Sequence, residues 1–155
     1  MSRSSMRRGN RGFTLIELLI VVAIIGIIAA VAIPALRLAV QRARQSRTMA
    51  DMRAIATAIE MYQNDNGFKP VLSLGPVDAV GVYLQPTYLK RTPLVDSWQE
   101  PLRYACAATS YTLWSYGADR LPQAAPALGP STSFSDDIIF SDGTFVQWPE
   151  GARAQ

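Results

Sequence analysis

The sequence has no histidine and a single cysteine, Cys106, among its 155 residues. An internal disulfide needs two cysteines, and histidine is both a common metal ligand and the usual general base near neutral pH. Neither a paired nucleophile and base nor a glycine-rich phosphate loop is found either. We therefore expect a protein without catalytic function, and an enzyme held in the membrane by a signal anchor is the poorly supported alternative.

Basic residues are concentrated at the N-terminus, where Arg3, Arg7, Arg8 and Arg11 precede any acidic residue. Without residues 1–12 the formal net charge of +3 becomes −1, so the basic balance does not favour a nucleic-acid partner. Arginines directly before an apolar segment are typical of a cytoplasmic end. We expect this short polar leader to stay in the cytoplasm and the C-terminal part to lie across the membrane.

An uncharged apolar run occupies residues 18–36. As a helix this run would extend about 28 Å, close to the thickness of the hydrocarbon core of a bilayer. Glu17 lies at its start, and an ionisable side chain in such a segment is a candidate functional residue. Gly26 and Pro34 lie within the run, where glycine costs about 1 kcal/mol and proline about 3 kcal/mol relative to alanine, so we expect flexibility there.

Two alternatives for this segment remain open. An ordinary secretory signal could be cleaved near Ala30-Val31-Ala32, which would leave a soluble domain beginning at Ile33. The pair Arg7-Arg8 could belong to a twin-arginine signal. Against a signal peptide stand the carboxylate of Glu17, the length of the run and a helical pattern that continues beyond it.

Residues 11–19, Arg-Gly-Phe-Thr-Leu-Ile-Glu-Leu-Leu, with Pro34 further on, resemble the leader and N-terminal helix of type IV pilins and type II secretion pseudopilins. The resemblance implies that prepilin peptidase cuts after Gly12 and that the new N-terminus, Phe13, is methylated. It also implies that Glu17 pairs with the N-terminus of a neighbouring subunit during polymerisation. The chain would then be a single-pass inner-membrane protein with a periplasmic head, whose partners are copies of itself, an assembly platform and minor pseudopilins.

The apolar periodicity changes after residue 36. Residues 37–64 are predicted to form an amphipathic helix, whose apolar face consists of Ala39, Val40, Ala43, Met52, Ile55, Ala56, Ile59 and either Tyr62 or Gln63. Four arginines early in this helix could bind anionic lipid or DNA, but a solvated or intersubunit face is the plainer interpretation.

Residues 65–155 are predicted to form the globular head. Its first part, residues 68–101, is rich in proline and glycine and is expected to be a connecting loop with a turn of helix within residues 82–89. Four strands are expected near residues 102–107, 111–116, 137–141 and 144–148, and Asp142-Gly143 predicts a type I′ hairpin between the last two. The predicted fold is therefore α+β, with a long helix packed on a small antiparallel sheet, as in pilins.

A second resemblance lies in the head. Asp96, Trp98, Pro101, Tyr104 and the step from Gly117 to Asp119 are similar to the major pseudopilin of type II secretion. This implies that the chain forms a secretion pseudopilus that drives protein export, and a type IV pilus serving adhesion, motility or DNA uptake is the alternative.

The same resemblance implies a calcium site within residues 116–137. Its ligands would be the carboxylates of Asp119, Asp136 and Asp137, with backbone carbonyls near Tyr116 and near Ser133 or Phe134, because calcium prefers six to eight oxygens. The segment 120–135 is longer than the corresponding loop of the family and could either wrap the ion or replace it. Aspartates that only cap turns and strand ends are the alternative.

Overall fold

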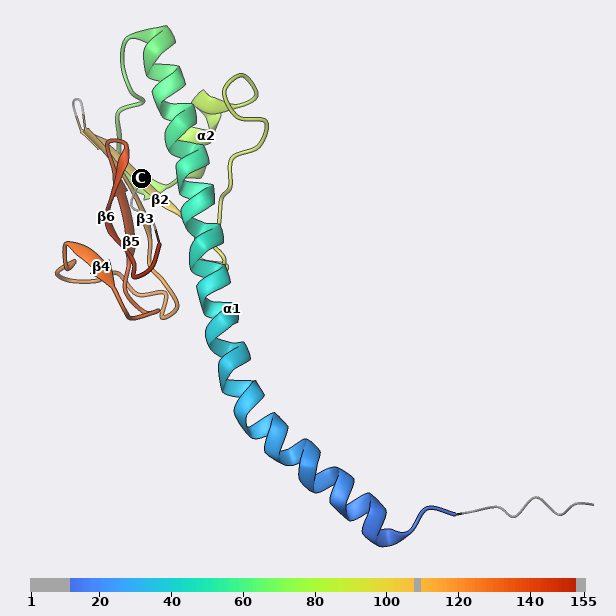
Figure 1. Ribbon diagram of the computed structural model, residues 1–155. Helices are drawn as coiled ribbons and strands as arrows, with labels where there is room; N and C mark the ends of the chain where they lie inside the picture. Colours follow the sequence, from blue (N-terminus) through green and yellow to red (C-terminus); the bar gives the residue numbers. More distant parts are fainter. Residues whose placement is uncertain (1–11, 108–109, 153–155) are drawn as a thin grey trace, which may run out of the picture. The chain divides into compact units, whose positions relative to one another are not determined.

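The computed structural model describes residues 12–107 and 110–152 (Figure 1). The chain divides into two compact units, one that ends at Ala39 and one that begins at Val40. Helix α1, Leu15–Asn66, is 52 residues long and contributes to both units. The predicted long N-terminal helix is thus confirmed as one continuous element.

The first unit contains the apolar part of α1. An 18-residue window of this helix has a mean hydropathy of 3.1 and none of it is buried, and no other helix in the described ranges is long and apolar enough to cross a membrane. The helix continues through Gly26 and Pro34 without a break. So large an exposed apolar surface requires a cover of lipid or protein, which is consistent with membrane anchoring.

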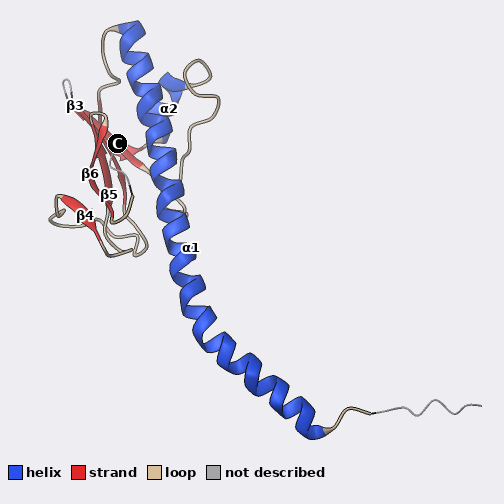
Figure 2. Ribbon diagram, in the orientation of Figure 1, coloured by secondary structure: helices blue, strands red, loops and turns tan. Residues whose placement is uncertain are grey.

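The second unit has its own hydrophobic core. From Gln45 onward α1 buries one face at helical spacing, and this face packs against the sheet (Figure 2). The buried apolar residues of this face are Met49, Met52, Ile55, Ala56, Ala58 and Ile59. The amphipathic pattern was therefore right for its later turns and wrong at Ala39, Val40 and Ala43, which are exposed.

The sheet of the second unit has six strands in the order β1-β2-β3-β5-β6-β4. The strands are β1 Leu72–Pro76, β2 Arg103–Ala107, β3 Ser110–Ser115, β4 Gly129–Ser131, β5 Ile138–Ser141 and β6 Thr144–Pro149. All pairs are antiparallel except β4 with β6, which is parallel. The four predicted strands are confirmed as β2, β3, β5 and β6, and the α+β class is confirmed with them.

The prediction of a plain connecting loop over residues 68–101 is wrong in two places. Strand β1 lies within it, and helix α2, Asp78–Leu84, begins four residues before the expected turn of helix. Both β1 and β4 contain glycine and proline and lie at the edges of the sheet, where a missing backbone donor is tolerated. These two strands therefore lack the alternation of apolar and polar residues from which a strand is predicted.

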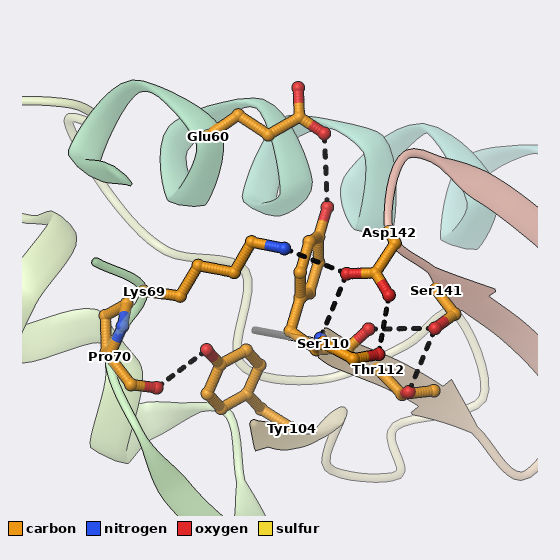
Figure 3. Close-up of polar contacts among 9 residues, drawn as sticks. Glu60, Lys69, Pro70, Tyr104, Ser110, Thr112, Ser141 and Asp142 are labelled. Carbon is orange, nitrogen blue, oxygen red and sulfur yellow. Dashed lines mark hydrogen bonds and ion pairs between the residues drawn. The ribbon is translucent and has the colours of Figure 1, made fainter. Parts of the chain in front are cut away.

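The hairpin between β5 and β6 turns at Asp142 and Gly143, with φ of 43° and 91°. Two positive φ values are what a type I′ turn requires, so this prediction is confirmed. The Asp142 carboxylate accepts hydrogen bonds from Lys69 Nζ at 2.9 Å, Ser110 Oγ at 2.5 Å and Tyr111 N at 3.1 Å (Figure 3). It thereby joins the turn to β3 and to the segment after α1.

Candidate assembly end and acidic loop

Gly12 and Phe13 precede α1 and are exposed. Phe13 is 73% exposed, and no atom lies within 4 Å of the position that a Cβ on Gly12 would occupy. The peptide bond between them is therefore outside regular structure, as a peptidase substrate needs. Cleavage and methylation at these residues stay predictions.

Thr14 and Glu17 cap the start of α1. Glu17 Oε2 accepts hydrogen bonds from Thr14 N at 2.8 Å and Thr14 Oγ1 at 2.7 Å, and Glu17 N donates to Thr14 Oγ1 at 3.3 Å. This reciprocal pattern is a capping box, and the spacing Thr-x-x-Glu was a signal for it that the sequence analysis missed. Both bonds to the carboxylate end on Oε2, so within the described residues the second oxygen of Glu17 accepts no hydrogen bond.

Gly26 and Pro34 lie inside α1, and a Cβ on Gly26 would have nothing within 4 Å. The structure therefore shows no close approach that would require glycine at this position. Flexibility of the helix at these two residues stays a prediction.

Asp96 organises the loop before β2. Its buried carboxylate accepts hydrogen bonds from Trp98 N at 2.8 Å, Glu100 N at 3.0 Å and Ser115 Oγ at 2.6 Å. The indole Nε1 of Trp98 donates to Gln41 Oε1 at 2.9 Å, so the loop is tied to α1 as well as to β3. Asp96 and Trp98, which belong to the second resemblance, thus have a structural role in the head.

The three aspartates of the predicted calcium site lie on the segment between β3 and β5. Asp119 is exposed and accepts from Leu121 N at 3.1 Å. Asp136 is half-buried and accepts from Gln123 Nε2 at 3.2 Å and from Ser131 Oγ. Asp137 is buried, and its Oδ2 accepts from Gln123 N at 3.1 Å.

The environment of Asp137 disfavours its charge. Burial raises the pKa of this carboxyl above its ordinary value; the N–H of Gln123 acts in the opposite direction, and the nearby Asp119 and Asp136 raise the pKa further. Asp137 Oδ1 and the buried Gln147 Oε1 have no hydrogen-bond partner in the part of the chain that the structure describes. An uncompensated carboxylate oxygen in such a place indicates a site that needs a proton, a water molecule or a cation.

The residues as they stand do not fit a calcium ion. Within residues 12–107 and 110–152, no three histidine, cysteine or acidic side chains are grouped so that they could hold a metal. Of the expected carbonyls, Phe134 O already accepts one hydrogen bond, from Ala118 N at 2.8 Å. Calcium at this loop therefore stays a prediction of the resemblance.

Gly117 lies at the start of this loop, where residues 134–136 pass close to it. Its φ is +70°, and a Cβ there would lie 2.7 Å from the backbone oxygen of Asp136 and 3.1 Å from those of Phe134 and Ser135. Gly117 is part of the second resemblance, which gives no physical reason for a glycine at this position. The reason is the close approach of residues 134–136.

An exposed apolar helix with a capped start, followed by a head in which the same helix packs on a mainly antiparallel sheet, defines a pilin-like subunit. Residues 7–33 match the prokaryotic N-terminal methylation motif. Residues 36–127 match the family of type II secretion system (T2SS) protein G, and the chain belongs to this family. Members of this family are the major pseudopilins of type II secretion, which are structural subunits.

Curated relatives agree with this assignment. The chain is 35% identical to the type II secretion system core protein G of Pseudomonas aeruginosa over 73% of this chain and 87% of that protein. It is 31% identical to the core protein G of Vibrio cholerae over 72% of this chain and 83% of that protein. A shorter match of 53% identity covers 36% of this chain and 35% of the type IV major fimbrial protein FimA of Dichelobacter nodosus. No solved structure matches the chain significantly.

Proposed function

We propose that the chain is the major structural subunit of a type II secretion pseudopilus. Prepilin peptidase cuts it after Gly12, Phe13 is methylated, and the processed subunit polymerises through its apolar helix to drive protein export. Before assembly it is a single-pass inner-membrane protein with its head in the periplasm. Its partners are copies of itself, the inner-membrane assembly platform and the minor pseudopilins.

The observation that carries this proposal is the combination of two matches on one chain. The methylation motif covers residues 7–33, and the protein G family covers the adjoining residues 36–127. An apolar helix surface of which no residue is buried among the described residues supports it. Contacts between identical helices related by a rotation and a rise do not close on themselves, so they produce an open filament.

Processing is tested on the mature chain isolated from membranes. N-terminal sequencing and mass spectrometry should find a chain that begins at Phe13 and carries one methyl group. A chain that begins at Ile33 and is recovered in the soluble fraction would show a cleaved signal peptide and would overturn the proposal.

The role of Glu17 is tested with two substitutions that separate its charge from its hydrogen bonds. In Glu17→Gln the side-chain oxygen still accepts from Thr14, so the start of α1 is kept while the negative charge is removed. We expect both Glu17→Gln and Glu17→Ala to be inserted and cleaved normally but to give no filament. Filaments from Glu17→Gln at the normal yield would show that the helix cap, rather than pairing with a neighbouring N-terminus, is what assembly requires.

A type IV pilus subunit is the second candidate, favoured by the 53% identity to a fimbrial protein over about a third of the chain. Deleting the gene separates the two functions. We expect loss of proteins from the culture medium with surface pili and twitching motility intact. Loss of surface pili with normal export would favour the pilus subunit instead.

A further inference from the structure

Gln123 lies in the acidic loop, the segment 116–137 that contains Asp119, Asp136 and Asp137, and it makes hydrogen bonds through three different groups. Its backbone N donates to Asp137 Oδ2 at 3.1 Å, and its side-chain Nε2 donates to Asp136 Oδ1 at 3.2 Å. Its side-chain Oε1 accepts from Gln147 Nε2 at 2.7 Å. One residue of the long segment thus bridges both adjacent carboxylates and strand β6.

Gln147 fixes the orientation of the Gln123 amide. It is fully buried on β6, and its Nε2 also donates to the backbone oxygen of Asp137 at 2.9 Å. A carbonyl oxygen can only accept, so the NH₂ group of Gln147 must face Asp137. Gln123 therefore presents its oxygen to Gln147, which leaves its own NH₂ group for the carboxylate of Asp136.

The remaining contacts join the end of the segment to the same cluster. Ser131, on the short strand β4, donates to the second carboxylate oxygen of Asp136. Strand β4 pairs with β6, and Glu150 N donates to Ser131 O at 2.7 Å. The segment from Gly117 to Asp137 is therefore bound to β6 at its middle and near its end.

We propose that Gln123, held by Gln147, takes the place of a metal ion in this loop, so that the head keeps its structure without calcium. Four of the six carboxylate oxygens of Asp119, Asp136 and Asp137 already accept a hydrogen bond from the chain. Two of these donors come from Gln123, and their hydrogens lie toward the carboxylates, where a cation would have to bind. Calcium needs six to eight oxygens, so these donors compete with it for most of the carboxylate oxygens of the loop.

Two oxygens of the cluster mark where an ion could still compete. Asp137 Oδ1 and Gln147 Oε1 are buried without a hydrogen-bond partner among the residues described. If these atoms bound calcium, the ion would stabilise the folded head over the unfolded chain, and chelation would lower the melting temperature. Stability with and without calcium therefore distinguishes the two arrangements.

The test is thermal unfolding of the full processed chain in detergent, in EDTA and in millimolar calcium. We expect the same melting temperature in both solutions for the natural sequence. Gln123→Ala should lower it by about 4–8 °C in EDTA, the equivalent of losing about 1 kcal/mol of net hydrogen bonding in a small domain. Gln63→Ala, which changes an exposed glutamine on α1, is the matched control and should leave the melting temperature within error.

Calcium binding by the natural sequence is measured separately, so the result does not depend on whether a variant folds. Absence of binding at millimolar calcium supports the proposal, and so does a calcium-dependent stabilisation that appears only in Gln123→Ala. A melting temperature that falls in EDTA and recovers with calcium in the natural sequence overturns it. A Gln123→Ala variant as stable as Gln63→Ala also overturns it. All these measurements use unassembled subunits, so they stand or fall independently of the secretion function.

Discussion

The hairpin at Asp142 offers a direct test of how the head is held together. Asp142 combines a left-handed backbone with a carboxylate that accepts from Lys69, Ser110 and Tyr111 (Figure 3). Asparagine tolerates the same left-handed φ and keeps one side-chain oxygen as an acceptor, whereas alanine disfavours this φ and has no side-chain acceptor. Comparing Asp142→Asn with Asp142→Ala therefore separates the charge from the turn and the hydrogen bonds.

The expected magnitudes follow from these contacts. The side chain of Asp142 is 42% exposed and that of Lys69 is 10% exposed, so their ion pair is only partly screened. Its loss in Asp142→Asn should cost about 0.5–1 kcal/mol. Asp142→Ala also removes the acceptor for Tyr111 N, at about 1 kcal/mol, and adds about 1–2 kcal/mol for a left-handed alanine. We expect a total near 2–4 kcal/mol for alanine.

The assay is urea unfolding of the processed chain in detergent, with Glu150→Gln as the control because it removes an exposed acid elsewhere on the head. Burial opposes ionisation of Asp142, but the hydrogen bonds from Ser110, Lys69 and Tyr111 outweigh it and hold its pKa below the ordinary value. Its charge therefore stabilises the fold above the unfolded pKa of about 3.9, and this contribution is lost as the pH falls through the folded pKa.

The stability difference between the natural sequence and Asp142→Asn should accordingly be constant from about pH 5 to 8 and shrink below about pH 3.9. Equal losses for the asparagine and alanine variants would refute the account of the turn. A difference between the natural sequence and Asp142→Asn that grew on acidification would refute the electrostatic part.

Three further predictions concern single residues. Gly117→Ala should destabilise the head by about 3 kcal/mol or more in the same urea assay, because a backbone oxygen would lie 2.7 Å from the new Cβ. Gly67→Ala is the control, since Gly67 has a similar positive φ but open space around it, and it should cost only about 1 kcal/mol. Asp96→Ala should cost about 3–5 kcal/mol, because it leaves two backbone donors and Ser115 without their buried acceptor; a loss below that of Asp142→Ala would contradict this. Thr14→Ala should leave the melting temperature of the head unchanged while speeding hydrogen exchange at the start of α1, and unchanged exchange would argue against the cap.

The parts of the fold that could be predicted are those whose signal is local and strong. The apolar run required a long helix, and Asp142-Gly143 required a turn with two positive φ values. Strands β1 and β4 could not be found in this way, because they are short, contain glycine and proline, and owe their extended structure to the neighbours with which they pair.

The acidic loop shows a different limit. Three aspartates that resemble a ligand set could be found in the sequence. The bond between Gln123 and Gln147, however, joins residues 24 positions apart, and Gln123 lies in a segment without periodicity. A glutamine such as Gln123, in a segment rich in proline and small residues, gives no sign in the sequence that a buried partner will orient its amide. By contrast, the spacing of Thr14 and Glu17 is a local sequence motif that predicts a helix cap. A carboxylate at the start of an apolar helix can thus serve both as a cap and as a partner for another subunit.

The two units obtain their stability from different sources. The second unit has a closed hydrophobic core and polar clusters at Asp96, Asp142 and Gln123 that its own residues satisfy in large part. None of the described residues of the first unit, 12–39, is buried, so its apolar helix depends on lipid or on other subunits. Substitutions in the head clusters should therefore change unfolding much more than assembly, whereas Glu17→Gln should abolish assembly and leave the unfolding of the head unchanged. A head substitution that prevented polymerisation at full thermal stability would show that subunit contacts extend onto the second unit.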